Sequence, residues 1–128
     1  MRLLLDTHAL LWFCEGSSEL STSAKNAMED SSNQCFVSHA SAWEIAIKLS
    51  LEKLHLDMGY EELFPMSVLT NGFHILDQKF AHYQELLSLP FHHRDPFDRL
   101  LIAQARKENM TLVSCDREFA AYGVPILW

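Results

Sequence analysis

The sequence has few cysteines, and their spacing is not that of a structural zinc site. Only Cys14, Cys35 and Cys115 occur among 128 residues. None lies at the CxxC or Cys/His spacing of a structural zinc site, and their number is odd. A chain of this length can bury a real core without disulfides. We therefore expect free thiols and a reducing compartment.

Long hydrophobic runs are also absent. A membrane-spanning helix needs roughly 18 consecutive apolar residues, and no stretch approaches this length. The N-terminal MRLLLDTHALLWFC superficially resembles a signal peptide, but Asp6 and His8 interrupt it and no small-residue cleavage site follows. We interpret this segment as folded protein, and we expect a cytoplasmic protein without a membrane partner.

Positive charge is scarce. Ten basic residues stand against 17 acidic ones, which gives a formal net charge of −7. This balance argues against a protein that binds nucleic acid through bulk positive charge. It leaves open an enzyme that acts on nucleic acid through bound cations, because metal ions neutralise clustered carboxylates locally.

Short apolar segments alternate with helical patterns along the chain. The expected strands cover residues 3–5, 35–37, 73–76, 111–114 and, at an edge, 124–127. The expected helices cover 7–13, 21–30, 38–54, 78–87 and 96–109, with one or two short helices within 55–71. No linker, repeat or low-complexity tract divides the chain, so we expect one domain over residues 1–128. This order predicts an α/β fold whose central parallel sheet is covered by helices on both faces.

Four acidic residues occupy corresponding places in this pattern. Asp6 directly follows the first strand, and Glu44 lies in the first turns of the helix after the second. Asp98 lies in the first turn of the helix that begins at Pro96, and Asp116 follows the strand that ends at Ser114. Ligands of parallel sheets bind beyond the carboxyl ends of the strands. We therefore expect all four acids at one edge of the sheet.

Each acid also has an alternative interpretation as a helix cap. Acidic side chains at helix N-termini accept hydrogen bonds from free N–H groups and favour the dipole. Asp6 and Asp116 precede helical turns, Ser41-Ala42-Trp43-Glu44 spells a capping box, and Asp95-Pro96-Phe97-Asp98 places acids at the N-cap and N3 positions. If the acids are only caps, the chain is a non-catalytic α/β module that binds another protein.

The four acids together favour a metal site over caps alone. Converging carboxylates raise one another's pKa unless a cation lies between them. Asp98 shares its helix face with Ile102 and Ala105, which places its carboxylate at the edge of the core. A buried charge without a partner there costs several kcal/mol. A ligand set made of oxygen atoms suits Mg²⁺ or Mn²⁺ rather than zinc.

Three stretches of the sequence follow one another in the order of a known family. They are LLLDTHALLW, VSHASAWEIAIKLSLEKL and HHRDPFDRLLIAQARKENMTLVSCDREF, and they span Leu3 to Phe119. With them the chain resembles PIN-domain ribonucleases, and most closely the VapC-type toxin of a type II, VapBC-type toxin–antitoxin system. DPFDRLLIAQA is the most specific of these motifs. The resemblance implies a PIN-like three-layer fold with a parallel sheet of four or five strands. It also implies metal-dependent endonucleolytic cleavage of RNA.

The resemblance places the family's acids on Asp6, Glu44, Asp98 and Asp116. Asp98 rather than Asp95 fits the pattern, because the apolar run Leu101-Ile102-Ala103 follows it at the right distance. Asp6 and Asp98 would then hold the main Mg²⁺ or Mn²⁺, and the other two would bind its waters or complete a second site. The resemblance further implies a small antitoxin that covers apolar grooves, near Trp12 or within residues 51–69, and a homodimer.

Other polar and aromatic residues near these positions have two interpretations each. Hydroxyl groups that either cap a helix or support the site belong to Thr7, Ser38 and Ser41. Basic residues that either contact RNA phosphates or lie on the surface are Lys48, Arg94, Arg99, Arg106 and Arg117. Three histidines, His8, His92 and His93, are candidate general bases. A metal-activated water would make such a base dispensable. Tryptophans expected in the core or at a partner contact are Trp12, Trp43 and Trp128.

Overall fold

A computed structural model describes residues 1–128 of the chain. Its strands are β1 (Arg2–Leu5), β2 (Gln34–Ser38), β3 (His74–Leu76), β4 (Thr111–Val113) and β5 (Ile126–Leu127). Its longer helices are α1 (Thr7–Glu15), α2 (Thr22–Glu29), α3 (His39–Ser50), α5 (Phe80–Leu87) and α6 (Pro96–Glu108). Shorter helical segments are η1 (Glu62–Ser67), α4 (Val68–Thr70) and η2 (Arg117–Tyr122). Most bounds lie within two residues of those expected from the sequence.

The five strands form one parallel sheet in the order β3-β2-β1-β4-β5. The central strand β1 pairs with β2 on one side and β4 on the other, so that Leu4 lies between Phe36 and Leu112. Leu3, Leu4 and Leu5 are fully buried. This explains the continuous apolar run in β1, because the central strand of a covered parallel sheet has no solvent-facing side. The predicted α/β fold is confirmed.

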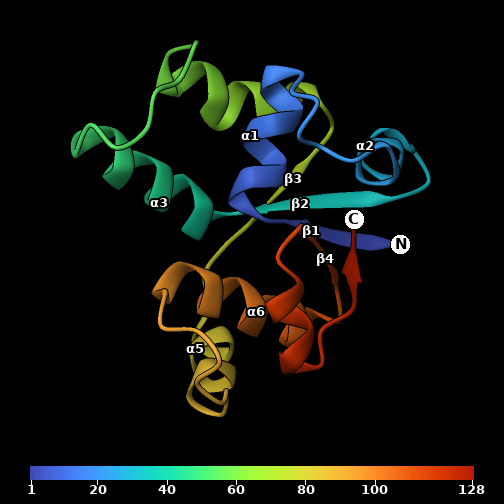
Figure 1. Ribbon diagram of the computed structural model, residues 1–128, viewed down its shortest axis with the longest axis vertical. Helices are drawn as coiled ribbons and strands as arrows, with labels where there is room; N and C mark the ends of the chain where they lie inside the picture. Colours follow the sequence, from blue (N-terminus) through green and yellow to red (C-terminus); the bar gives the residue numbers. More distant parts are fainter.

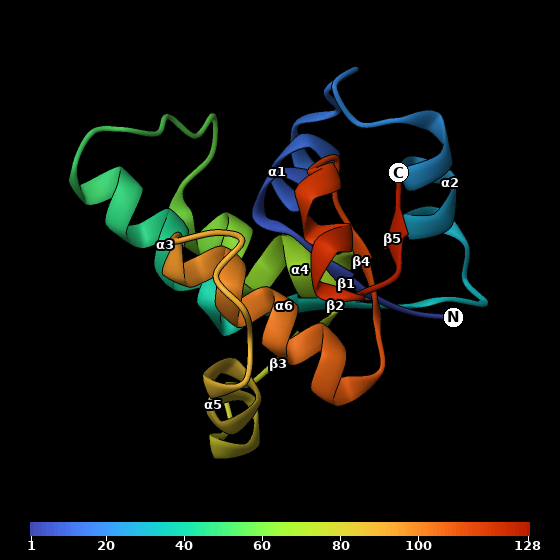
Figure 2. The ribbon, with the colours of Figure 1, turned by 60° about the horizontal axis from the view of Figure 1, so that its bottom comes forward.

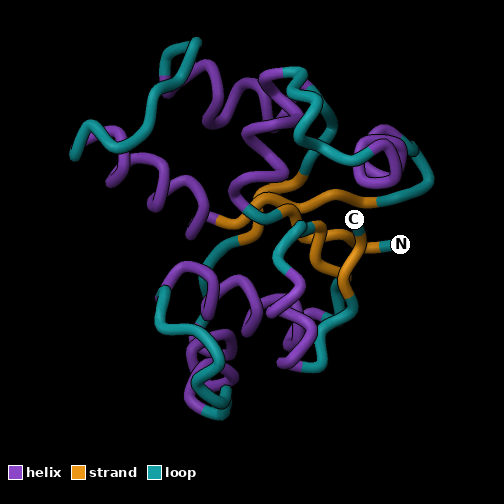
Figure 3. The backbone as a smooth tube through the Cα atoms, viewed as in Figure 1, coloured by secondary structure: helices purple, strands orange, loops and turns teal.

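Successive side chains of β1 enter two separate cores. Leu3 and Leu5 pack in the core that α1, α2 and α4 cover, whereas Leu4 packs in the core beneath α6 and η2. Figure 1 shows the sheet between these two groups of helices, and the same three layers are visible in the tube of Figure 3. No helix has the length and apolar character needed to cross a membrane.

Helix α3 differs from the sequence prediction in its end and in its buried face. It ends at Ser50 rather than at residue 54, and Glu52 follows with φ at 55°, a conformation that cannot continue a helix. Its buried side consists of Ala40, Ser41, Glu44 and Ile45, while Trp43 and Leu51 are 57% exposed each. The large apolar residues at helical spacing in this segment are Trp43, Ile47, Leu51 and Leu54, and they predict a different buried face. That prediction is wrong.

The position of α3 explains this reversal. Ile45 packs with Leu11 of α1 and Leu63 of η1 in a third, smaller core. This contact rotates the helix so that its polar positions Ser41 and Glu44 also face inward, toward the start of α1. The N-terminal end of α3 lies beside α6, as Figures 1 and 2 show. The helix therefore carries an acid into the interior at the carboxyl edge of the sheet.

Candidate metal centre

Asp6 lies at the carboxyl end of β1 and begins α1. Its Oδ1 accepts a hydrogen bond from the Ala9 N–H at 2.7 Å, so the predicted cap is present. The Asp6 N–H donates to the Val113 carbonyl, which joins the ends of β1 and β4. Burial raises the pKa of Asp6, although hydrogen bonds from Ser114 and Ala9 oppose the shift. Capping occupies one carboxylate oxygen and leaves the other available to a ligand.

Glu44 is a buried acid whose two oxygens are both engaged. The Thr7 hydroxyl donates to Oε1 at 2.7 Å, and the Lys48 ammonium donates to Oε2 at the same distance. The predicted capping box is absent, because α3 begins earlier and Ser38 caps it by accepting from the Ala40 N–H. Glu44 caps nothing, so its burial needs another explanation than helix capping.

Thr7 connects α1 to the buried face of α3. Its hydroxyl oxygen lies 2.7 Å from Glu44 Oε1 and 3.1 Å from the Ser41 hydroxyl. We expect Thr7→Val to weaken Mg²⁺ binding by roughly tenfold or more, because residues that orient metal ligands contribute this much to affinity. Thr7→Ser keeps the hydroxyl and should retain most of the affinity. Calorimetric titration of metal-free protein measures both, and equal affinities for the two variants would contradict the role of the hydroxyl.

Asp98 carries the most perturbed carboxyl group. Its pKa is raised to about 7, first by burial and then by the negative charges of Asp95 and Glu44. His93 lowers the pKa and Asp116 raises it further. No hydrogen bond from the protein offsets these effects. The shift therefore places the predicted acids within electrostatic reach of one another, around a carboxylate that lacks a partner.

Asp95, rather than Asp98, caps α6. Its Oδ1 accepts from the N–H groups of Phe97 and Asp98 at 2.8 and 3.1 Å, with Pro96 at the first helical position. This is the cap that the sequence predicts. Because Asp95 performs that task, capping does not explain Asp98.

Asp116 caps η2 and is the most exposed of the four acids. Its Oδ1 accepts from the Glu118 N–H at 3.0 Å, while its Oδ2 lies 3.4 Å from His93 Nε2. As with Asp6, the cap uses one oxygen only. Electrostatic coupling thus relates Asp6 to Glu44, and Asp98 to both Glu44 and Asp116, although no three of these acids bring ligand atoms within 4.8 Å of one another. Two of the four acids are caps and two cap nothing.

The donor chemistry fits a hard divalent cation. All four groups are carboxylates, Asp6 and Asp116 each keep an oxygen outside their caps, and Asp98 accepts no hydrogen bond. A cation beside Asp98 would offset the charges that raise its pKa. By this criterion Asp6, Asp98 and Asp116 would hold it, whereas both oxygens of Glu44 are already engaged by Thr7 and Lys48.

Two neighbours of the site have contacts that the sequence does not indicate, although His93 is among the candidate bases named from the sequence. His93 and Glu118 lie against Asp116. His93 is 23 positions away from Asp116, a separation that no local pattern can detect. Arg99 is buried and donates to main-chain carbonyls, so it fits neither of its two interpretations, a phosphate contact or a surface charge.

Comparison with known proteins agrees with this architecture. The sequence matches the family model described as PIN domain over residues 3–125. The chain belongs to the PIN-domain family. No curated protein matches the sequence. The PIN-domain motifs predicted from the sequence thus correspond to a family match over nearly the whole chain.

Solved structures share the PIN fold at low sequence identity. The crystal structure of VapBC2 from Rickettsia felis, bound to a DNA fragment from their promoter, gives a TM-score of 0.73 at 16% identity, covering 98% of this chain and 97% of that one. FitAcB from Neisseria gonorrhoeae gives 0.67 at 18% identity, covering 97% and 95%. FitAB bound to an IR36 DNA fragment gives 0.68 at 16% identity, covering 97% and 92%. At these identities the likeness concerns the fold alone.

Proposed function

We propose that this PIN domain is a metal-dependent endoribonuclease and the toxin of a VapBC-type toxin–antitoxin pair. The observation that carries the proposal is Asp98, whose pKa of about 7 results from burial beside the other acids. Membership in the PIN-domain family supports a nuclease, and the resemblance of the motifs supports RNA as its substrate.

The chain's own residues would divide the work. Asp6 and Asp98 hold the cation, while Glu44 and Asp116 bind its waters or a second cation. Thr7 and Lys48 fix the orientation of the Glu44 carboxylate through its two oxygens. Bound Mg²⁺ or Mn²⁺ lowers the pKa of a coordinated water and offsets charge on the phosphate oxygens. Since the bound metal would supply an activated water, we propose that the RNA 2′-hydroxyl takes no part.

An aromatic pair borders the acids and offers a surface for bases. Trp43 precedes Glu44, Phe97 precedes Asp98, and their ring centroids lie 5.2 Å apart in an edge-to-face contact. Trp43 is largely exposed, which excludes the core and leaves the other expected role, a contact with a partner. Exposed rings stack on single-stranded bases, and in such proteins basic residues contact the nucleic-acid backbone.

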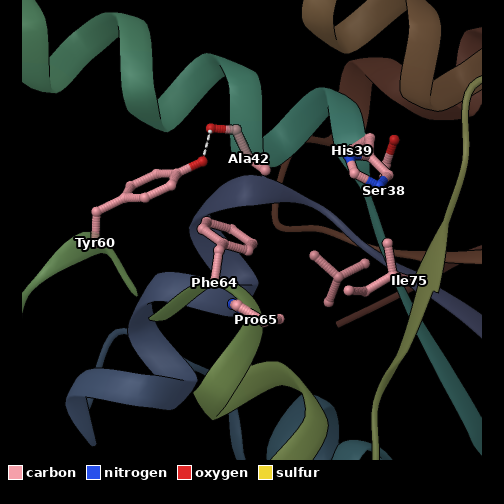
Figure 4. Close-up of a pocket in the computed structure, with 8 residues that line it drawn as sticks. Ser38, His39, Ala42, Tyr60, Phe64, Pro65 and Ile75 are labelled. Atoms are coloured by element: carbon pink, nitrogen blue, oxygen red, sulfur yellow. Dashed lines mark hydrogen bonds between the residues drawn. The ribbon is translucent and has the colours of Figure 1, made fainter. Parts of the chain in front are cut away.

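The antitoxin would occupy an apolar pocket of about 320 Å³ on the flank of α3. Figure 4 shows Tyr60, Phe64 and Pro65 lining it opposite Ala42 and Ile75, and the Tyr60 hydroxyl donates to the Ala42 carbonyl at 2.8 Å. Of its eight lining residues, Tyr60, Phe64 and Pro65 belong to the region 51–69 that the sequence suggests for partner binding. The pocket contains none of the four acids, so an antitoxin segment there must extend further to reach them. We propose the homodimer on the resemblance alone.

Cleavage of a defined single-stranded RNA tests the proposal directly. We expect cleavage with Mg²⁺ or Mn²⁺, none with EDTA, and 5′-phosphate rather than 2′,3′-cyclic phosphate ends. Glu44→Gln should reduce the rate by about a hundredfold or more. The matched control is Asp57→Asn, which changes an exposed acid that is not among the four acids of the candidate centre. If purified protein cleaves no RNA and Mg²⁺ does not change its melting temperature, the alternative function is supported: a protein-binding module whose acids are helix caps.

A further inference from the structure

Three potential metal ligands meet beside the candidate centre, and one of them is a histidine. His93 Nε2 lies 3.4 Å from Asp116 Oδ2 and 3.2 Å from Glu118 Oε2. One ligand atom from each residue falls within 4.8 Å of the others. Nε2 is buried and has no hydrogen-bond partner of suitable geometry, while the His93 side chain is 11% exposed. A buried imidazole nitrogen without a partner is an unusual feature that calls for a ligand.

The position of this imidazole is fixed by its surroundings. The main-chain N–H of His93 donates to the Tyr122 hydroxyl at 2.7 Å. The His93 ring stacks on the Tyr122 ring, with centroids 5.6 Å apart. The Phe119 ring packs edge-to-face against the His93 ring, with centroids 5.2 Å apart. Both aromatic residues belong to η2, the segment that Asp116 caps and that contains Glu118. The three ligands are therefore held by one small substructure rather than by independent loops.

The spacing matches a tetrahedral ion. Bonds of roughly 2.0–2.2 Å to nitrogen and carboxylate oxygen place neighbouring ligand atoms about 3.3 Å apart in a tetrahedron. The two distances from His93 Nε2 are close to this value. Imidazole nitrogen and carboxylate oxygen are both ligands that zinc accepts, and the imidazole distinguishes this set from the all-oxygen sets of Mg²⁺.

We propose that His93, Asp116 and Glu118 bind Zn²⁺ at a second site that adjoins the carboxylate centre. The two sites share Asp116, whose Oδ1 already caps η2. Only Asp116 Oδ2 then remains to bind a metal, at either the Zn²⁺ site or the carboxylate centre. Occupation by Zn²⁺ would consequently withdraw Asp116 from the Mg²⁺ centre and inhibit cleavage. This last consequence rests on the proposed function, whereas Zn²⁺ binding itself does not.

Direct metal binding tests the site without any activity. Metal-free full-length protein is titrated with Zn²⁺ by calorimetry and with Co²⁺ by visible absorption, which reports tetrahedral coordination. We expect one tight site in the wild type and at least tenfold weaker binding in His93→Gln. His92→Gln changes the exposed neighbouring histidine and should bind as the wild type does. Equal binding by the His93 and His92 variants, or no binding by the wild type, would overturn the proposal.

A second variant guards against misfolding and against a simple ion pair. Glu118 is exposed, so Glu118→Gln should fold normally and still lose affinity for Zn²⁺. If His93 merely shares a proton with the two carboxylates, wild-type protein will bind no Zn²⁺ at neutral pH. The ratio of RNA cleavage with and without Zn²⁺ is then compared between wild type and Glu118→Gln. Zn²⁺ binding without Mg²⁺-dependent cleavage would refute the proposed function and leave the zinc site standing.

Discussion

Replacing Asp98 by asparagine should raise the melting temperature of metal-free protein by several degrees at pH 7.5 and remove its response to Mg²⁺. The Asp98 carboxyl is partly buried beside Asp95 and Glu44, and nothing in the chain donates a hydrogen bond to it. Ionisation therefore destabilises the native state when no cation is present. Asparagine has nearly the same shape and no charge, so it relieves the repulsion but cannot replace the metal ligand.

The pH dependence gives this expectation its sign. The pKa of Asp98 is raised from 3.8 to about 7, so between these values the native state binds more protons than the unfolded state. The stability contributed by this group is present at low pH and is lost as pH rises through the folded-state pKa. Because Asp98 is partly exposed, solvent screening limits the effect, and we expect about 1–2 kcal/mol.

Melting temperatures in EDTA from pH 5 to 8 check this prediction. The melting temperature of the wild type should fall relative to that of Asp98→Asn as pH rises. With Mg²⁺, the wild type alone should gain stability, rising with the logarithm of metal concentration above the dissociation constant, because the cation binds only the native state. Asp95→Asn, which keeps the cap on α6, should retain the Mg²⁺ response. Parallel curves for wild type and Asp98→Asn, with and without Mg²⁺, would count against a metal at this residue.

The fold was largely predictable because its determinants are local. The apolar run Leu3-Leu4-Leu5 in β1 indicates a covered strand, and Asp95-Pro96 marks the start of α6 through local contacts alone. The caps at Asp6 and Asp116 were equally readable, since each bonds an N–H two or three residues away. The order of the strands was not predicted, because it depends on which distant segments pair with β1.

The site was predictable only to the extent that its residues follow strands or begin helices. This rule finds the acids but says nothing about contacts across long stretches of sequence. Thr7 reaches Glu44 across 37 positions, and their hydrogen bond has no sequence signature. The buried face of α3 was misjudged for the same reason, because its contact with α1 and η1 outweighs the apolar stripe around Trp43.

Arg99 is the residue whose role changed most between sequence and structure. Its guanidinium is buried and donates through Nη1 to the Pro90 carbonyl at 2.8 Å and through Nη2 to the Leu89 carbonyl at 3.4 Å. It also stacks on the ring of Phe91 at 3.9 Å. Instead of contacting phosphate, Arg99 thus fastens the segment 88–95 to α6. That segment includes His93 and the Asp95 cap.

Arg99→Ala should destabilise the protein by about 2–4 kcal/mol, because two carbonyls lose a charged donor and a buried side chain is deleted. Arg94→Ala, on the exposed part of the same segment, should change stability by about 0.5 kcal/mol or less. Arg99→Lys keeps the charge but not the two-pronged geometry, so we expect an intermediate loss. Urea unfolding gives the three values, and amide hydrogen exchange should rise over residues 88–95 in Arg99→Ala. If Arg99→Ala were as stable as Arg94→Ala, the segment would be held by its own packing on Tyr122 and Phe119.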